Sequence, residues 1–103
     1  MSERLFRKRR RYILVEDSRN TQDPHVFEAV RDVFQRLYGA VGLAESGLKK
    51  VDVRGHLAVS CYKEWVPKTV LAITLVREVA GLKTVLKTVK VSGTIRSLVE
   101  DLG

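Results

Sequence analysis

The chain has 103 residues, 45% of them apolar, and a formal charge of +7 from 19 Lys and Arg against 12 Asp and Glu. This length fits one hydrophobic core rather than two, and the apolar share excludes a wholly disordered chain. Residues 1–11 hold six of the bases and one acid, so most of the charge lies there. The sequence predicts a basic arm over residues 1–11, a single domain over residues 12–103, and a polyanionic partner, either nucleic acid or an acidic membrane surface.

Export and membrane insertion are not predicted. The basic arm leads only into a short apolar run, residues 13–15, before two acids end it. A signal peptide needs a longer apolar segment, and a membrane-spanning helix needs roughly 18 apolar residues. Cys61 is the only cysteine, which excludes an intramolecular disulfide and a cysteine-based zinc site. We therefore expect a cytoplasmic protein with no membrane partner.

A strand and a long amphipathic helix are predicted first. Residues 12–15 are apolar and β-branched, which is typical of a short strand. Asp23-Pro24 indicates a helix start, because Asp can cap free N–H groups and Pro is tolerated in the first turn. Apolar residues then recur at three- and four-residue steps over residues 26–41. We expect the glycines in and after this stretch to divide it into a helix and a looser apolar tail: Gly39, Gly42 and Gly47.

A β-hairpin and a second helix follow. Residues 49–54 and 57–62 alternate between side chains expected to be buried and exposed, and Arg54-Gly55 stands where a tight turn is needed. Pro67 favours the start of a second amphipathic helix, which we expect to continue to Gly81.

The end of the chain completes the fold prediction. Residues 84–91 are rich in Val and Thr and predict the last strand; a turn at 92–94 and a short helix over 95–102 follow. Both long helices must bury an apolar face. We therefore predict an α+β, ferredoxin-like sandwich of the kind seen in RNA recognition motifs, with a four-stranded antiparallel sheet, two helices on one face and a short C-terminal helix.

The sequence offers no convincing catalytic or metal site. His25 and His56 are far apart and lack a metal-ligand spacing, so we interpret both as surface or turn residues. Cys61 falls in the apolar alternation of a strand and is predicted to be buried. We interpret Glu16-Asp17 as the solvated end of a strand rather than a metal site. No catalytic residue, metal or protein-bound cofactor is predicted.

Two alternatives to nucleic-acid binding stay open. Residues 16–20 follow the first strand with two acids and no glycine, whereas a phosphate cradle requires glycines and backbone N–H groups. A small phosphate-acting enzyme is therefore disfavoured, although Arg19 and Asn20 keep it possible. The other alternative is a protein-interaction or dimerisation module that binds no nucleic acid.

The base-stacking pattern of RNA recognition motifs is incomplete. Residues 54–61 match its third-strand signature at the basic residue, the glycine and the valine, but the aromatic positions hold His, Ala and Cys. Tyr12 and Tyr62 each offer one ring, although a tyrosine in a sheet more often serves packing. We therefore predict RNA binding through phosphate contacts and shape.

Basic residues supply the candidate phosphate contacts. A further phosphate site is predicted at the start of the last helix, whose free N–H groups follow Ser92, Gly93 and Thr94. Simple helix capping, for which Ser97 and Glu100 have the spacing, is the alternative there. For the lysines of the last strand the alternative is an ordinary solvated face. The candidate RNA-binding residues are Arg7, Lys8, Arg9, Arg10, Arg11, Lys49, Lys50, Lys83, Lys87, Lys90 and Arg96.

Four stretches resemble one known family. Residues 9–13, 42–49, 71–76 and 91–96 read RRRYI, GLAESGLK, LAITLV and VSGTIR, in the order in which the family has them. On these stretches the chain resembles archaeal ribonuclease P protein component 2, a small basic subunit of the RNA-based enzyme that removes 5′ leaders from precursor tRNA.

The resemblance implies a function without catalytic protein residues. In that family the RNA carries out the hydrolysis with Mg²⁺ bound to the RNA, and the protein supports the catalytic RNA. The implied partners are ribonuclease P RNA, precursor tRNA and ribonuclease P protein component 3, as a dimer of heterodimers. The resemblance also favours RNA over a membrane as the polyanionic partner.

Overall fold

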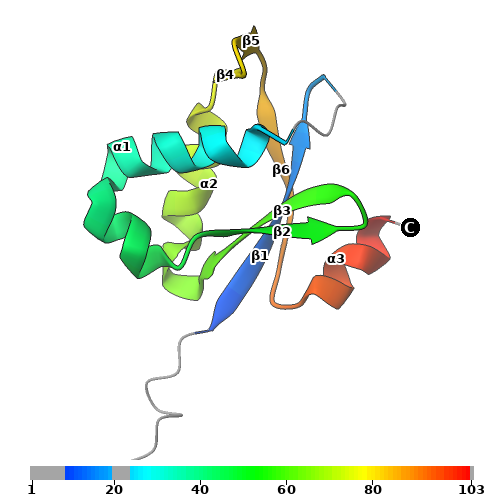
Figure 1. The fold of residues 1–103 in the computed structure, drawn as a ribbon. Coiled ribbons are helices and arrows are strands. Elements are labelled where there is room, and N and C mark those ends of the chain that lie inside the picture. Colours follow the sequence, from blue (N-terminus) through cyan, green and yellow to red (C-terminus); the bar gives the residue numbers. More distant parts are fainter. Residues whose placement is uncertain (1–8, 20–23, 103) are drawn as a thin grey trace, which may run out of the picture.

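The predicted strands and helices occur in the predicted order, with three short unpredicted elements after the third strand, over the described part of the chain, residues 9–19 and 24–102 of a computed structural model (Figure 1). The elements are β1 (Arg10–Asp17), α1 (Val26–Ser46), β2 (Lys49–Val53), β3 (His56–Tyr62), the short 3₁₀ helix η2 (Lys63–Trp65), α2 (Val66–Leu75), β4 (Glu78–Val79), β5 (Leu82–Lys83), β6 (Leu86–Ser92) and α3 (Ile95–Leu102).

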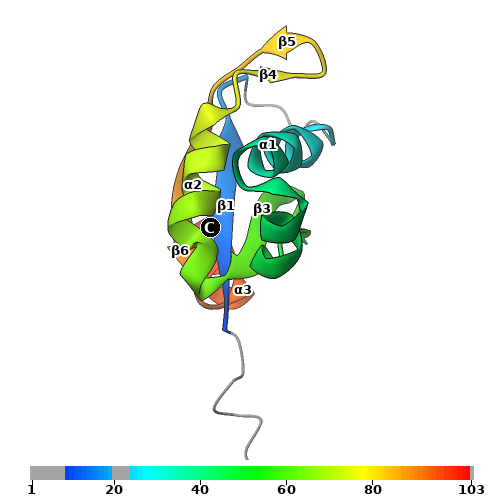
Figure 2. The same ribbon diagram turned by 90° about the vertical axis from the view of Figure 1, so that its left-hand side faces the viewer.

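The main sheet has four antiparallel strands in the order β2-β3-β1-β6. Strand β1 is central, and its Ile13 lies opposite Val59 on β3 and Val91 on β6. Helices α1 and α2 form one layer, with α3 apart from them (Figures 1 and 2). The predicted ferredoxin-like α+β fold is confirmed.

The two faces of the sheet carry separate hydrophobic cores. Ile13 and Val15 pack with the apolar faces of α1 and α2, whereas Leu14 packs on the opposite face with Leu98 of α3. The predicted exposure of alternate residues on β3 is therefore wrong. Residues 58–61 are all buried, because α3 covers Ala58 and the side chain of Arg10 reaches Ser60.

The first strand and helix differ from their predicted bounds. Strand β1 begins at Arg10 instead of Tyr12, so two arginines assigned to the arm are strand residues. The N-cap of α1 is His25, and the predicted cap Asp23 lies outside the described residues. The chain kinks at Gly39 (φ 75°, ψ 177°) and continues as helix to Ser46, so the apolar tail is helical rather than loose.

The second long helix ends earlier than its predicted end at Gly81. Helix α2 stops at Leu75, and β4 and β5 form a small hairpin whose turn residues Ala80 and Gly81 have φ of 51° and 81°. The sequence predicted a longer helix because two residues of the same core, Val76 and Val79, are three positions apart, which is also the spacing of residues on one face of a helix. None of the helices in residues 9–19 and 24–102 has the length and apolar character that a membrane-spanning helix requires.

Candidate RNA interface

Arg10 anchors the start of β1 to two distant segments. Its Nη1 donates hydrogen bonds to the carbonyl oxygen of Gly47 (2.8 Å) and to Oγ of Ser60 (3.0 Å). Its guanidinium also lies over the ring of Tyr62, 4.7 Å from the ring centroid. Both hydrogen-bond acceptors are neutral, so the charge of Arg10 is held in place without being neutralised by them.

Arg9 and Arg11 flank this anchored arginine. Arg9 is exposed, and its carbonyl oxygen accepts a hydrogen bond from the backbone N–H of Lys63 (2.7 Å). Nη1 of Arg11 donates to the carbonyl oxygen of Arg10 (3.0 Å) and lies beside Gly93, where an added Cβ would be 3.6 Å away. Arg11, the last arginine of the predicted arm, is thus brought to the turn that precedes α3.

Strand β2 adds further basic residues. Lys49 and Lys50 are exposed at the start of this edge strand, and Lys49 lies opposite Ser60, the acceptor of Arg10. We name the resulting cluster the basic end of the sheet, and it comprises Arg9, Arg10, Arg11, Tyr12, Lys49 and Tyr62.

The predicted cations near α3 have local partners. Nζ of Lys90 donates to the carbonyl oxygen of Ser97 (3.3 Å), and Lys90 is only half exposed. The side chain of Arg96 is 90% exposed and lies 3.7 Å from the carboxylate of Glu100. Such an exposed pair is weak, so Arg96 can still contact an anion.

Two predicted residues lie away from the basic end. Lys83 is on β5, and Lys87 lies opposite Glu16 near the far end of β1. Six residues of extended strand separate Arg10 from Glu16, which corresponds to about 20 Å. The structure therefore divides the predicted cations into two groups, and Arg7 and Lys8 lie outside the described residues.

The hydroxyl groups of the turn before α3 accept hydrogen bonds from nearby backbone N–H groups. The backbone N–H of Thr94 donates to Oγ of Ser92 (3.2 Å), and the N–H of Ser97 donates to Oγ1 of Thr94 (3.2 Å). Thr94 therefore acts as an N-cap, whereas Glu100 lies beside Arg96 instead of closing a capping box with Ser97. The phosphate site at Ser92, Gly93 and Thr94 stays a prediction.

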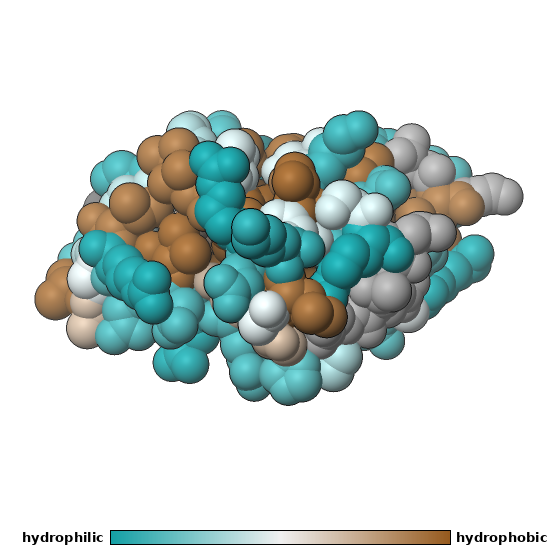
Figure 3. Space-filling view, turned by 90° about the horizontal axis from the view of Figure 1, so that it is seen from above, coloured by the Kyte–Doolittle hydropathy of each residue, from teal (hydrophilic) through white to brown (hydrophobic). Residues whose placement is uncertain are grey.

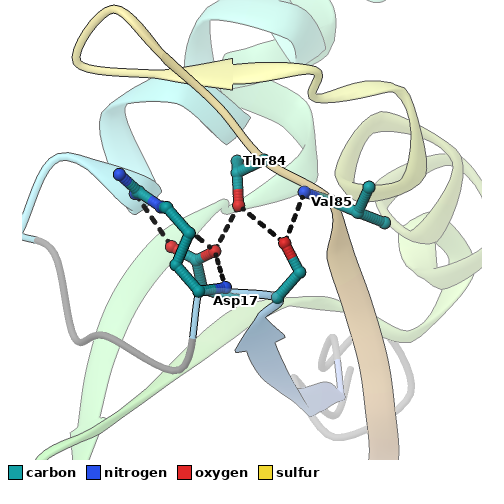
Figure 4. Close-up of polar contacts among 5 residues, drawn as sticks. Asp17, Thr84 and Val85 are labelled. Atoms are coloured by element: carbon teal, nitrogen blue, oxygen red, sulfur yellow. Dashed lines mark hydrogen bonds and ion pairs between the residues drawn. The ribbon is translucent and has the colours of Figure 1, made fainter.

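The interpretation of Asp17 as a solvated strand end is wrong. Asp17 is 6% exposed and accepts hydrogen bonds from the backbone N–H (3.0 Å) and Nη2 (2.9 Å) of Arg19 and from the hydroxyl of Thr84 (Figure 4). Ser18 Oγ lies 3.2 Å from Thr84 Oγ1 and accepts from the N–H of Val85 (3.1 Å). The sequence could not show this because Thr84 is 67 residues away from Asp17.

Burial and hydrogen bonding act on Asp17 in opposite directions. Burial raises the pKa of its carboxyl group, but the hydrogen bonds from Arg19 and Thr84 outweigh it and hold the pKa below its ordinary value. Asp17 is thus an ionised structural group, and Arg19 is engaged with it. This arrangement gives the phosphate-acting alternative no support.

Cysteine and histidine side chains are the other groups that could react chemically. Cys61 is completely buried, as predicted, and this burial raises the pKa of its thiol. His25 and His56 are exposed, as predicted. Within residues 9–19 and 24–102, no group of three or more His, Cys, Asp or Glu side chains is placed to hold a metal ion.

The opposite side of the molecule also exposes apolar side chains. Helices α1 and α2 expose large aliphatic side chains, namely Leu37, Val41, Leu71 and Leu75. Seen from above, apolar residues gather on the side of these helices and are crossed by hydrophilic side chains (Figure 3). A groove of about 810 Å³ runs between α1 and the segment from Leu75 to Gly81, and Arg31, Asp32, Arg77 and Glu78 bring both signs of charge to it.

Similarity to known proteins agrees with this architecture. The model of the Rpp14/Pop5 family matches residues 11–102, nearly the whole domain. The chain belongs to the Rpp14/Pop5 family. This family supplies protein subunits of the ribonuclease P and ribonuclease MRP ribonucleoproteins, and its archaeal form is ribonuclease P protein component 2.

A solved structure shows the same fold. A chain in a cryo-EM structure of yeast ribonuclease MRP matches with a TM-score of 0.56 and 11% identity, covering 93% of this chain and 89% of that one. No curated protein matches the sequence significantly. Membership of the Rpp14/Pop5 family therefore rests on the family match, and the solved structure supports the fold.

Proposed function

We propose that this Rpp14/Pop5 protein supports the catalytic RNA of ribonuclease P by holding RNA phosphates at the basic end of the sheet. The observation that carries the proposal is the strand register together with the contact of Arg10: Lys49 of β2 lies opposite Ser60 of β3, and Ser60 accepts a hydrogen bond from Arg10 at the start of β1. Arg10 is fixed there by neutral acceptors, so its charge adds to those of its neighbours.

Individual cations have different roles in this proposal. Arg9, Arg11, Lys49 and Lys50 contact phosphates directly, and Arg96 adds a contact near the turn that precedes α3. Lys90 takes part from its position beside α3, where Ser92, Gly93 and Thr94 offer the neighbouring phosphate site. Lys83 and Lys87 form a second contact, and Lys87 lies opposite Glu16, about 20 Å along β1 from Arg10. Arg7 and Lys8 extend the basic end along the chain.

The proposed mechanism is charge neutralisation. RNA helices repel one another, and cations placed between them allow the helices and the catalytic Mg²⁺ on the RNA to stay close. The protein then binds no cofactor and contributes no catalytic residue, while the RNA cleaves the 5′ leader of precursor tRNA in the cytoplasm. Binding is expected to weaken with salt by about 0.7 to 0.9 logarithmic units per phosphate contact and tenfold increase in salt.

The helical side is the proposed protein interface. Exposed aliphatic residues on α1 and α2, such as Leu71 and Leu75, give this side the apolar character that the centre of a protein interface requires. We assign it to ribonuclease P protein component 3, in a dimer of heterodimers. RNA and protein partners then occupy opposite layers of the molecule.

Reconstitution tests this function. Ribonuclease P RNA and component 3 are assayed for precursor-tRNA cleavage with and without this chain, and with an Arg9→Gln/Arg11→Gln variant. The wild-type chain should stimulate cleavage, and the variant should do so less at moderate salt. A complete lack of stimulation by the wild-type chain would contradict the proposal and favour an interaction module that binds no nucleic acid.

A further inference from the structure

We propose that the basic end of the sheet takes an unpaired nucleotide, whose base stacks on the layered pair of Arg10 and Tyr62. The proposal rests on the proposed function, because it specifies which form of RNA that same surface binds. The signature of RNA recognition motifs did not indicate it, since residues 54–61 end one position before Tyr62.

The strand register places two tyrosines on one face of the sheet. Tyr12 lies opposite Ser60, and Arg10 lies opposite Tyr62 on the same pair of strands. Side chains two residues apart on a strand share a face, so Tyr12 and Tyr62 are diagonal neighbours, about 7 to 8 Å apart. Aromatic residues on neighbouring strands of a four-stranded sheet are the arrangement on which RNA recognition motifs stack two or three bases.

The stacking surface is already ordered. The guanidinium of Arg10 lies over the Tyr62 ring and is fixed by the hydrogen bonds from Nη1 to Gly47 and Ser60. A guanidinium is planar and stacks on aromatic faces. A base can therefore stack on the Arg10 guanidinium, on the side that faces away from the Tyr62 ring. Because both groups are held beforehand, little side-chain entropy is lost on binding.

Gly47 makes this close packing possible. It has φ of 64°, and a Cβ added there would lie 2.6 Å from the Tyr62 ring and 3.0 Å from Nη2 of Arg10. The ring and the guanidinium are therefore packed directly against the backbone that ends α1. This contact links the C-cap of the first helix to the proposed nucleotide site.

The surroundings favour a short, anionic occupant. Arg9 and Arg11 flank Arg10 in the chain, Lys49 lies opposite Ser60, and no acidic residue occurs among the paired residues 10–12, 49, 60–62 and 92. Farther along the same face, α3 packs over Leu14 and Ala58. Among the described residues, the half-exposed part of this face at Arg10, Tyr12 and Tyr62 therefore suits one or two unpaired nucleotides with phosphates, rather than a long single strand.

Fluorescence and affinity measurements on the full chain test the proposal. The probes are a ten-nucleotide oligoadenosine with a central 2-aminopurine and an RNA duplex of equal charge. The wild-type chain should quench 2-aminopurine and prefer the single strand. Tyr62→Leu should weaken single-strand binding about tenfold and reduce quenching, because it removes the ring that supports the Arg10 guanidinium on which the base stacks. Duplex binding should change less than twofold.

Matched variants separate stacking from charge and from folding. Tyr38→Leu removes a ring from the helical side, where Tyr38 packs against Phe34 and Trp65, and should leave single-strand binding unchanged. Tyr62→Phe should retain both affinity and quenching. Arg10→Lys keeps the charge but loses the planar group, so it should weaken the single-strand preference, whereas Arg36→Lys on exposed α1 should not.

Each outcome has a definite meaning. Equal binding of single strand and duplex without quenching would overturn the nucleotide site while leaving phosphate binding intact. Binding of neither RNA would overturn the proposed function as well. Displacement of the oligonucleotide by polyglutamate at equal charge concentration would show that the site is an acidic-peptide site. If Tyr62→Leu fails to fold, wild-type quenching and Arg10→Lys decide the question.

Discussion

The two ends of β1 each hold a charged side chain in place, a buried one at Asp17 and a half-buried one at Arg10, but with opposite consequences. At one end Asp17 accepts hydrogen bonds from Arg19 and Thr84, so a cation neutralises its charge within the fold. At the other end Arg10 donates to a carbonyl oxygen and a hydroxyl and lies over a ring, all of them neutral. A charged side chain that is fixed by the fold therefore indicates a binding surface only where its partners leave the charge uncompensated.

Removing the compensated charge should have the largest effect. Asp17→Ala leaves Arg19 and Thr84 without their shared acceptor, and losing one member of a buried hydrogen-bonded pair costs about 3 kcal/mol. We expect the melting temperature to fall by about 10 to 20 °C. Glu16→Ala, at the exposed neighbouring position, is the control and should change stability by less than about 0.5 kcal/mol. Equal losses in both variants would show that the Asp17 cluster is not a stabilising group.

Acid should weaken the same end of β1. The pKa of Asp17 is lower in the folded chain than in the unfolded chain, so its ionisation stabilises the fold above the unfolded value and this stability is lost as pH falls through the folded value. Denaturant unfolding of wild type and Asp17→Asn should therefore differ most near neutral pH and converge below about pH 4. A difference that stays constant from pH 7 to pH 3 would contradict the assigned role of the carboxylate.

Substituting Gly47, at the Arg10 end of β1, should lower stability less than Asp17→Ala does. Gly47→Ala places a Cβ against Tyr62 and Arg10, whereas Gly39→Ala places one where nothing lies within 4 Å, also at a positive φ. Backbone strain should cost Gly47→Ala, in the left-handed helical region, about 1 kcal/mol, and Gly39→Ala more, because its combination of φ and ψ is open essentially to glycine alone. Only Gly47→Ala should also weaken single-stranded RNA binding, by about threefold. Equal RNA affinities in two folded variants would show that the packing around Tyr62 does not serve binding.

Local patterns in the sequence predicted much of the fold. The hairpin around Arg54-Gly55 formed as expected, since both residues have positive φ (51° and 82°) and the flanking strands alternate. The end of α2 was mistaken because Val79 follows Val76 at a helical spacing while belonging to a strand. Periodicity alone does not separate these two cases.

The site was less accessible to sequence reasoning. Its basic residues were identified, but their division into two groups depends on the register of β1 with β3 and β6. The contacts of Arg10 reach 37 and 50 residues along the chain, and such distances leave no local pattern. Extending the first strand back to Arg10 would have placed Arg10 opposite Tyr62 and revealed the pair.

Salt-dependent binding of ribonuclease P RNA tests the central claim most directly. The triple variant Arg9→Gln/Arg11→Gln/Lys49→Gln is compared with Arg31→Gln/Arg36→Gln/Arg77→Gln, which removes the same charge from exposed positions on the helical side. If the basic end holds phosphates, the first variant lowers the slope of log affinity against log salt by about 2 to 3, and the second leaves it nearly unchanged. Equal reductions in both would contradict a localised RNA site at the basic end of the sheet.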